Sequence, residues 1–389
     1  MVMNMALESV REWVYACVRC STCKYTLNEY FDSCPAGKQF QLESYWPSGK
    51  VWIARGLLEG QLQFSDSIVK KIFACTTCGS CTVQCELEVH DHLLEIIEAL
   101  RAEAVNQGFG PLESQKAFEE NIAADHNPYK EDHAERTSWV KEAFELKDTA
   151  DVLYFVGCTS SYREAEIATN MLELLKKTDT DMTISKDEWC CGSPLLRTGQ
   201  LKLVRELAEH NMDMIKNSGA KTVVFSCAGC YRTFKEDYLP LLGTEPEFEL
   251  FHVTDYIVKL INEGKIQFKE DAPPVKVTYH DPCHIGRHCG IYDSPRKILT
   301  SIPGVELVEM KRNREYAWCC GAGGGVKSGF KDWAIDIASE RIKEAEETGA
   351  QILISACPFC KRNLMDAIKA TGSNLEFMDI TEFVNSRLA

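Results

Sequence analysis

The residue type that could do chemistry in this chain is cysteine, of which the 389 residues contain nineteen. Ten of them form two sets of five that recur in the same order, at offsets of 125 to 130 residues, so the chain contains an internal duplication. Each set consists of a single cysteine, a Trp-Cys-Cys-Gly stretch and a C-x-x-C pair. The first set is Cys158, Cys190, Cys191, Cys227 and Cys230, and the second is Cys283, Cys319, Cys320, Cys357 and Cys360.

Eight further cysteines lie near the N-terminus in two C-x-x-C-x-x-C triplets, each followed by a fourth cysteine. This spacing is typical of bacterial two-cluster ferredoxins, in which the fourth cysteine of each run ligates the other [4Fe–4S] cluster. It predicts two cubane clusters, one held by Cys17, Cys20, Cys23 and Cys85 and the other by Cys34, Cys75, Cys78 and Cys81. The long gap before Cys34 and the glutamate after Cys85 depart from the ferredoxin pattern.

Zinc sites and disulfide bonds are the alternative uses of so many cysteines. Structural zinc sites take four ligands from paired motifs, and triplets of cysteines fit them poorly. Disulfide scaffolds suit short secreted chains, whereas Met1–Tyr15 lacks the continuous apolar core of a signal peptide. Iron–sulfur ligation is therefore favoured, and analysis of iron and acid-labile sulfide would distinguish it from zinc.

The cysteines of both repeats follow apolar runs of strand length. These runs end shortly before Cys158, Cys227, Cys283 and Cys357, and occupy residues 152–156, 222–225, 275–279 and 352–354. Helical periodicity is expected over residues 163–177, 201–216, 294–302 and 333–348. Strands that alternate with helices predict parallel sheets with helical cover, and sites in such folds lie beyond the carboxyl ends of the strands.

The fold class that follows is α/β, with an N-terminal helical two-cluster ferredoxin-like domain and two duplicated Rossmann-like halves. Helices expected over 52–62 and 90–104 favour a helical module over a compact β-containing ferredoxin. A polar connecting segment is expected to wrap over a neighbouring domain or partner. The predicted boundaries are 1–110 for the ferredoxin-like domain, 111–150 for the connecting segment, 151–270 for the first repeat and 271–389 for the second.

Charge and hydropathy limit the partners of the chain. The net charge of −15 opposes non-specific binding of nucleic acid, which depends on neutralising phosphates. Every apolar run is far shorter than the roughly 20 residues of a membrane helix, so we expect no direct membrane span. The expected location is the cytoplasm, and contact with the inner face of a membrane would have to go through a partner.

The five-cysteine pattern resembles the CCG domain, the cysteine-rich domain of heterodisulfide reductases and related iron–sulfur oxidoreductases. A two-cluster ferredoxin domain followed by two CCG repeats is similar, over nearly the whole chain, to the family of heterodisulfide reductase D subunits. That family is equivalent to the C and B subunits fused. The resemblance implies one non-cubane [4Fe–4S] cluster for each five-cysteine set, hence two in total. Gly192 and Gly321 would let the backbone lie close to the metal.

The resemblance also implies a reaction, the reductive cleavage of a disulfide of the coenzyme M–coenzyme B type. Electrons would pass from the two cubanes to the two non-cubane clusters, each of which would capture one sulfur. Two alternatives stay open: an electron-relay subunit that links a flavin dehydrogenase, membrane cytochrome b or quinone to another redox partner, or a reductase of a disulfide or trisulfide on a carrier protein. Each requires a partner such as a flavoprotein, a ferredoxin-type protein or a membrane cytochrome b, because no flavin or nicotinamide fingerprint is present.

Candidate catalytic groups lie in the stretch from His280 to His288. His284 adjoins a cluster ligand and would titrate near neutrality, so it could deliver a proton, or it could hydrogen-bond a sulfide or the backbone. Arg287 could bind an anionic substrate group or offset cluster charge. Four other cations follow cysteines of the sets and carry the same two interpretations: Arg197, Arg232, Lys361 and Arg362.

The glycine-rich loop from Gly321 to Gly325 invites comparison with a phosphate-binding loop, but it lacks the Walker lysine and hydroxyl residue. We expect Gly323 and its neighbours to give a substrate or a partner chain close access to the cluster. The first repeat has Ser193-Pro194-Leu195-Leu196 instead, so the two cluster pockets should differ, as an asymmetric substrate would require. Cys289 belongs to neither set and is expected to be a plain buried thiol.

Overall fold

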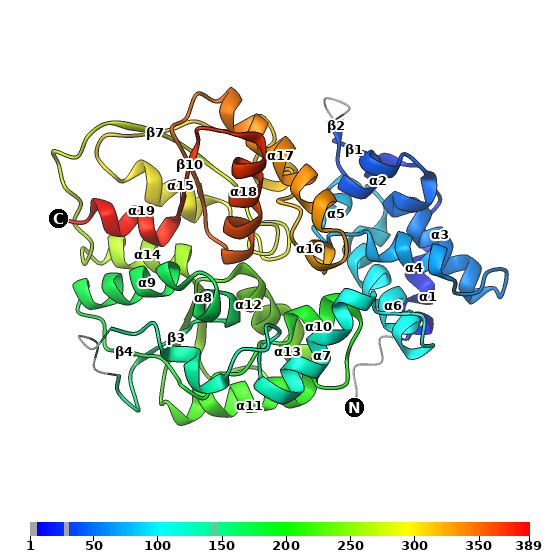
Figure 1. The fold of residues 1–389 in the computed structure, drawn as a ribbon, viewed down its shortest axis with the longest axis horizontal. Helices are drawn as coiled ribbons and strands as arrows, with labels where there is room; N and C mark the ends of the chain where they lie inside the picture. The colour runs from blue at the N-terminus through cyan, green and yellow to red at the C-terminus, as the bar shows by residue number, and fades with distance from the viewer. Residues whose placement is uncertain (1–5, 27–30, 142–143, 145) are drawn as a thin grey trace.

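The structure is a computed structural model that describes residues 6–26, 31–141, 144 and 146–389. It contains an N-terminal helical domain at one end and two α/β repeats that lie against each other (Figure 1). The N-terminal domain is blue to cyan in Figure 1, the first repeat is mostly green, and the second is yellow to red. Of the described helices, none has the length and apolar character needed to span a bilayer.

The N-terminal domain is mainly helical, as expected, with one short antiparallel hairpin that the sequence did not predict. The predicted helix at 52–62 starts earlier because Pro47 occupies its first turn, where a missing backbone N–H costs nothing. The elements of the N-terminal domain are η1 (Leu7–Val10), α1 (Arg11–Ala16), η2 (Thr22–Lys24), β1 (Tyr25–Thr26), β2 (Phe31–Asp32), α2 (Pro35–Phe40), η3 (Glu43–Tyr45), α3 (Pro47–Leu58), α4 (Asp66–Phe73), α5 (Ser80–Gln84), η4 (Glu88–His92) and α6 (Leu93–Asn106).

The connecting segment contains one regular helix, α7 (Glu113–Asp125), and one short turn, η5 (His133–Thr137). Helix α7 was not expected, because only Gln115 and Ile122 of its residues are buried and its apolar periodicity is weak. It packs against α10 (Ser193–Thr198) of the first repeat and α16 (Val326–Gly329) of the second. The segment thus wraps over neighbouring domains of the same chain.

The first repeat has a four-stranded parallel sheet in the order β4-β3-β5-β6. The second repeat has the same topology, with the order β8-β7-β9-β10, which confirms the duplication. The first comprises β3 (Val152–Phe155), α8 (Cys158–Tyr162), α9 (Ala165–Lys177), β4 (Met182–Thr183), α10 (Ser193–Thr198), α11 (Val204–Asn217), β5 (Thr222–Phe225), α12 (Ala228–Arg232), η6 (Thr233–Asp237), α13 (Tyr238–Leu242), β6 (Glu249–His252) and α14 (Val253–Asn262). The second comprises β7 (Val275–Tyr279), α15 (Asp293–Thr300), β8 (Val305–Leu307), η7 (Arg314–Tyr316), α16 (Val326–Gly329), α17 (Lys331–Glu347), β9 (Ile352–Ser355), α18 (Pro358–Thr371), β10 (Glu376–Asp379) and α19 (Ile380–Arg387).

Strands β3, β5 and β9 are buried along their whole length and β7 over its last three residues, as central parallel strands covered by helices must be. The two repeats join where α9 packs on α19 and α14 packs on α15, at the seam between the green and the red parts of Figure 1. Asn385 of α19 donates to Asn170 and Glu173 of α9 at 2.9 Å each. One continuous apolar core runs through both repeats. The repeats therefore pack into one unit in which the carboxyl ends of the two sheets can share a site.

Candidate functional site

One cavity of about 270 Å³ lies between the two repeats, and nine of the ten repeat cysteines line it. The tenth, Cys319, is buried directly beside Cys320. The predicted strands end just before the cysteines, so Cys158 and Cys227 of one sheet lie opposite Cys283 and Cys357 of the other. All nineteen thiols are free, so disulfides do not explain their proximity. The five-cysteine sets of the two repeats thus meet at one site.

The first set gathers its thiols within hydrogen-bonding range of one another. Hydrogen bonds with Cys158 and Cys191 raise the pKa of Cys190 well above its ordinary value. Hydrogen bonds from Cys190 and Cys230 hold the pKa of Cys191 well below it. The guanidinium of Arg136 approaches the Cys158 sulfur at 3.7 Å and pairs with the buried Glu188. A cationic donor therefore stands behind this set.

The second set repeats the arrangement. Cys360 donates to the Cys320 sulfur at 3.3 Å, and hydrogen bonds from Cys319 and Cys360 hold the pKa of Cys320 well below its ordinary value. The pKa of Cys319 is raised through hydrogen bonds with Cys283 and Cys320. In each Cys-Cys pair the second thiol is thus the more easily ionised. Since the thiolate is the form that binds metal, the donor chemistry of both sets fits iron–sulfur ligation.

The two glycines that follow the Cys-Cys pairs adopt a left-handed backbone, with φ +82° at Gly192 and +84° at Gly321. A side chain on Gly321 would lie 2.6 Å from the Ala334 carbonyl and 2.9 Å from Ile337 Cβ, both on α17. At Gly192 the nearest atoms would be 3.6 Å away. The turn geometry requires glycine in both repeats, and the second repeat also requires it for space.

The N-terminal cysteines gather in the two groups that the spacing predicts. Cys17 and Cys20 interact with Cys85, and Cys23 also interacts with Cys85. Cys34 interacts electrostatically with Cys75 and Cys78. A second cavity is lined by all four members of the latter group, Cys34, Cys75, Cys78 and Cys81. The exchange of the fourth cysteine between the two runs accords with this proximity.

The four groups of thiols form an ordered series through the molecule. Cys81 of the second N-terminal group interacts with Cys23 of the first. Cys78 of the same group shares a hydrogen bond with Cys319 of the second repeat. Cys357 in turn shares a hydrogen bond with Cys227 of the first repeat. Groups far apart in the sequence thus lie near one another, through the charges of Cys81 and Cys23 at one end and through hydrogen bonds between thiols in the rest of the series.

His284 lines the shared cavity, as its role as a candidate proton donor would require. Burial, followed by the nearby Arg197, lowers the pKa of His284 to about 4. This corrects the expectation that the ring titrates near neutrality, because the low-polarity setting disfavours its charged form. At neutral pH the ring is a neutral imidazole that has one N–H to donate.

Arg287 lies apart from the residues that line the cavity. Its Nε donates to the Cys78 carbonyl at 2.7 Å, and its Nη1 donates to the carbonyls of Ala317 at 2.7 Å and Glu315 at 3.1 Å. It therefore sits at the contact between the N-terminal domain and the second set. There its positive charge faces Cys78, Cys283 and Cys319.

The four other candidate cations differ in whether they are paired with carboxylates or available at the cavity. Arg197 is buried between Glu98 and Asp237, each at 2.7 Å, although part of it reaches the cavity wall. Arg232 pairs with Asp237 at 2.6 Å, and Lys361 with Glu382 at 2.6 Å. Arg362 lines the cavity with its side chain one-third exposed, and its pairing with Glu164 is 3.6 Å long. Arg362 is thus the candidate placed to meet an anion.

Several wall residues were missed from the sequence. Lys327 and Ser328 of α16, together with Tyr129 of the connecting segment, line the cavity. Nothing in their local sequence distinguishes them from surface residues. The signal that could have found them is position, because Lys327 and Ser328 closely follow the glycine-rich loop and Tyr129 lies in the connecting segment, and both of these reach the cavity.

The glycine-rich loop contacts the N-terminal domain of its own chain. A side chain on Gly323 would lie 2.6 Å from the Thr76 carbonyl, and one on Gly324 would lie 2.5 Å from the Cys75 carbonyl. The same loop lines the cavity with Gly323 to Gly325. Close approach thus connects the second N-terminal group to the cavity wall. Cys289 is half-buried, and burial raises its pKa to about 12.

Comparison with known proteins follows the same division of the chain. Residues 13–89 match the 4Fe-4S dicluster domain, and residues 152–235 and 277–365 match the cysteine-rich CCG domain. The D subunit of the dihydromethanophenazine:CoB–CoM heterodisulfide reductase of Methanosarcina barkeri is 41% identical, with 96% of this chain and 93% of that one covered. The B subunit of the fumarate reductase (CoM/CoB) of Methanothermobacter marburgensis is 30% identical over 95% of this chain and 71% of its own length.

More distant similarities are narrower. The EtfAB:quinone oxidoreductase of Syntrophomonas wolfei is 31% identical over 80% of this chain and 46% of its own. A hypothetical protein of Helicobacter pylori with a crystal structure has a TM-score of 0.59 at 9% identity, covering 90% of this chain and 69% of that one, which shows the fold alone.

A dicluster domain joined to two cysteine-rich domains around one cavity defines an iron–sulfur oxidoreductase subunit of the [4Fe–4S] type. The chain belongs to the family of heterodisulfide reductase D subunits. The resemblance that the cysteine spacing indicated is thereby confirmed.

Proposed function

We propose that this protein reductively cleaves a disulfide of the coenzyme M–coenzyme B type in the cavity between its two repeats. The observation that carries the proposal is that both five-cysteine sets meet at one cavity of about 270 Å³, which nine of the ten cysteines line and which Cys319 adjoins through Cys320. A disulfide has two sulfurs, and one set is available for each. The relatives named as D subunits of heterodisulfide reductase match over nearly their whole length, which supports the same substrate class.

The cofactor complement that we propose is two cubane and two non-cubane [4Fe–4S] clusters. The ligands would be the two N-terminal groups and the two five-cysteine sets. When bound, the clusters would supply single electrons and iron sites with affinity for sulfur. The protein supplies the ordered series of neighbouring thiols, from Cys23 and Cys81 through Cys78 and Cys319 to Cys357 and Cys227.

The roles of the wall residues follow from their placement. Arg362 binds an anionic group of the substrate at the cavity wall, because its guanidinium is only loosely paired there. His284, neutral and buried, donates its N–H to a developing thiolate. Arg287 contacts backbone carbonyls beside Cys78, so we assign it the positioning of the second set against the N-terminal domain. Gly192, Gly321 and Gly323 keep the backbone close to the clusters.

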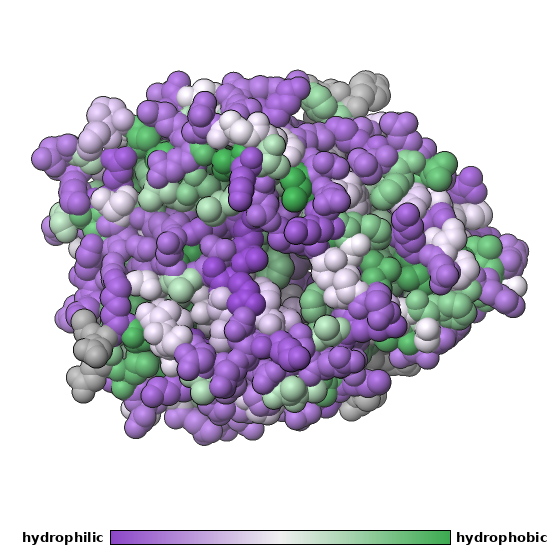
Figure 2. Space-filling model, in the orientation of Figure 1, coloured by the Kyte–Doolittle hydropathy of each residue, from purple (hydrophilic) through white to green (hydrophobic). Residues whose placement is uncertain are grey.

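An electron-relay role is the second candidate, and the surface of the N-terminal domain favours it. Six of the eight exposed large apolar side chains among the described residues lie there, including Val18 and Leu42. Figure 2 shows hydrophilic residues over most of this view, with apolar patches over that domain. Cys20 is exposed, unlike the other described cysteines. We propose that a flavoprotein, a ferredoxin-type protein or a membrane cytochrome b docks near Cys20, and that the protein is cytoplasmic and reaches a membrane only through such a partner.

The test is anaerobic reduction of the coenzyme M–coenzyme B disulfide with reduced viologen, followed by electron paramagnetic resonance after addition of each thiol. Turnover together with a thiol-dependent signal is the expected result. A fully loaded protein with neither turnover nor a thiol-dependent signal would contradict the proposal and favour the relay. A trisulfide or disulfide on a carrier protein as the only reduced substrate would indicate the third possibility.

A further inference from the structure

His280 is a buried histidine at the second five-cysteine set that the proposed reaction does not use. It directly follows β7, and its backbone N–H donates to the Ile354 carbonyl at 2.8 Å. Its own carbonyl accepts from Ser355 Oγ at 3.0 Å. A ring nitrogen of His280 and the sulfurs of Cys320 and Cys360 all lie within 4.8 Å of one another. The ring is thus held against the sulfurs of the second set.

The partner of the other ring nitrogen decides which nitrogen carries the proton. Arg341 Nε donates to His280 Nδ1 at 3.1 Å. A guanidinium can only donate, so Nδ1 must use its lone pair, and in the neutral ring the proton resides on Nε2. Nε2 is buried and has no conventional hydrogen-bond partner among the described residues. The nitrogen left to face the cysteines is therefore an N–H donor.

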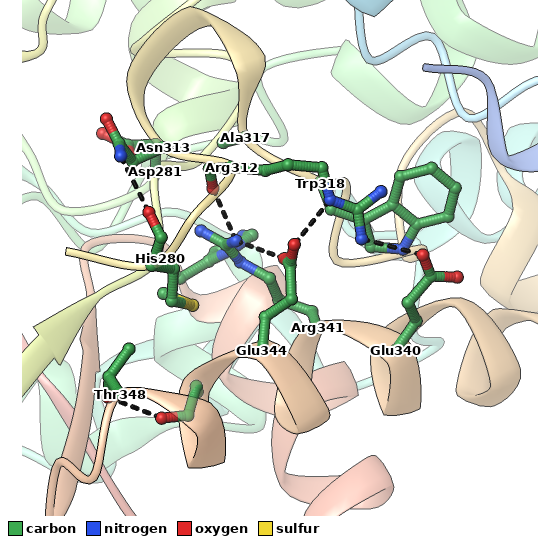
Figure 3. A network of polar contacts seen from close by, with 12 residues as sticks. His280, Asp281, Arg312, Asn313, Ala317, Trp318, Glu340, Arg341, Glu344 and Thr348 are labelled. Atoms are coloured by element: carbon green, nitrogen blue, oxygen red, sulfur yellow. Dashed lines mark hydrogen bonds and ion pairs between the residues drawn. The ribbon is translucent and has the colours of Figure 1, made fainter. Parts of the chain in front are cut away.

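Arg341 is itself locked in place. It is fully buried, and its Nη1 donates to Glu344 and to the Arg312 carbonyl, each at 2.7 Å. Glu344 also accepts from Arg312 Nε at 2.6 Å. Figure 3 shows this network between α17 and the loop that leads to Trp318, with the Arg341 side chain directed at His280. The guanidinium of Arg312 stacks 4.4 Å from the Trp318 ring, which adjoins the Cys-Cys pair. The tautomer of His280 is thus set by a rigid frame.

We propose that His280 donates an Nε2–H hydrogen bond to the sulfurs of the second cluster, and that Arg341 positions it to do so. The same geometry argues against His280 as an additional iron ligand, because ligation needs the lone pair that the Nε2 proton occupies. The inference rests on the proposed function only in requiring an iron–sulfur cluster at the second set. It holds equally for a disulfide reductase and for an electron relay.

The first repeat lacks this donor. The residue three positions before its first cysteine is Phe155, where the second repeat has His280 before Cys283. Hydrogen bonds to cluster sulfurs stabilise the reduced, more negative state and so make the reduction potential more positive. His280 therefore makes the second cluster easier to reduce than it would be with phenylalanine. The two clusters differ in their donors although their cysteine ligands are equivalent.

The test compares His280→Phe, which installs the residue of the first repeat, with His280→Gln, which keeps an N–H donor. Reduction potentials of all centres are measured by paramagnetic-resonance titration of the anaerobically purified, loaded protein. In His280→Phe we expect one non-cubane centre to become harder to reduce by about tenfold in its one-electron equilibrium, or about 59 mV, with the other centres unchanged. His280→Gln should recover most of the loss. His210 lies beside Trp189 of the first repeat, and the control His210→Gln should leave unchanged the centre that His280→Phe shifts.

A second measurement needs no variant. In wild-type protein labelled with ¹⁵N-histidine, electron–nuclear double resonance should detect a weakly coupled nitrogen and an exchangeable proton at one non-cubane centre. A strong coupling typical of iron-bound nitrogen, or no histidine coupling, would overturn the inference even if His280→Phe fails to fold. Equal shifts of all centres in His280→Phe would also overturn it, because they would indicate a structural role. A second set without any cluster would instead overturn the proposed cofactor complement.

Discussion

In each Cys-Cys pair the second thiol is the more readily ionised of the two. Neighbouring thiols donate to Cys191 and to Cys320, and this lowers the pKa of both well below the ordinary value. Thiolates bind iron without first losing a proton. Each of these two residues is therefore well suited to bind iron.

Under the proposed cofactor complement, we expect Cys191→Ser and Cys320→Ser each to remove one non-cubane cluster and to leave the cubanes in place. Serine keeps the size of the side chain but lacks the soft thiolate that iron–sulfur clusters prefer. The measurement is iron and acid-labile sulfide per chain, with paramagnetic resonance of the reduced protein. Cys289→Ser is the matched control and should keep full iron content. Unchanged iron and spectra in both pair variants would refute the ligand assignment.

At the scale of elements, the two repeats use the same turn under different packing. Gly192 and Gly321 share a left-handed backbone, but only Gly321 lies against α17, beside the Ala334 carbonyl and Ile337 Cβ. A side chain at Gly192 would therefore strain the backbone, whereas a side chain at Gly321 would strain the backbone and also overlap α17.

Gly321→Ala should therefore be much more harmful than Gly192→Ala. A left-handed alanine costs about 1 kcal/mol in either repeat, while the clash with Ala334 and Ile337 adds overpacking of about 1–3 kcal/mol at Gly321. Anaerobic urea unfolding and iron content per chain would measure both effects. Equal losses in the two variants would show that α17 moves aside without cost.

Helix α19 begins at a carboxylate whose burial sets a pH dependence. Asp379 accepts from Thr381 N at 2.9 Å and Thr381 Oγ1 at 2.7 Å, and burial raises its pKa to about 7. The pKa of Asp379 is higher in the folded than in the unfolded protein, so its protonated form favours folding. This contribution to the unfolding free energy is complete below about pH 4 and is lost as pH rises through about 7. Between pH 5.5 and 8 we expect wild-type protein to lose about 2 kcal/mol more unfolding free energy than Asp379→Asn. Parallel pH profiles in anaerobic urea titrations would refute the assignment.

Much of this arrangement of elements could be predicted, and the reason is locality. Short apolar runs indicate the strands before Cys158, Cys227, Cys283 and Cys357, and the spacing of the cysteines indicates which of them lie together. The sequence indicates that all four cysteines follow strand ends, and hence that a site lies there, but it does not indicate how the two repeats pack around the cavity. Helix α7, the pairing of Arg136 with Glu188 and the contact of Arg341 with His280 depend on residues distant in the chain, so no local pattern indicates them.

At the scale of the whole molecule, the buried Arg101 of α6 holds the three parts of the chain together. Its guanidinium donates to the Arg197 carbonyl of the first repeat at 2.6 Å and to the Gly324 carbonyl of the second at 2.9 Å. It also donates to the Ile72 carbonyl at 3.0 Å and the Cys75 carbonyl at 2.5 Å in the N-terminal domain. One side chain thus satisfies carbonyls of all three parts at their junction.

Arg101→Met should lower the unfolding free energy by about 3 kcal/mol, because several buried carbonyls lose their donor at once. It should also slow electron transfer from viologen to the repeats by loosening the contact of Cys78 with Cys319. Anaerobic urea unfolding and stopped-flow reduction measure the two effects. Arg55→Met is the control, since that arginine makes a surface pair with Glu59 and should cost under about 1 kcal/mol. Similar losses in both variants would contradict the role of Arg101.

The contact between Cys78 and Cys319 determines which of the two repeats would receive electrons first. The described cysteines of the N-terminal domain meet the second repeat at that point, whereas the first repeat is reached through Cys357 and Cys227. The two repeats have the same topology, but electrons from the N-terminal domain would therefore reach the second repeat before the first. Under the proposed cofactor complement, the half nearer the source would be replenished first after each turnover, and the farther half would wait for its neighbour.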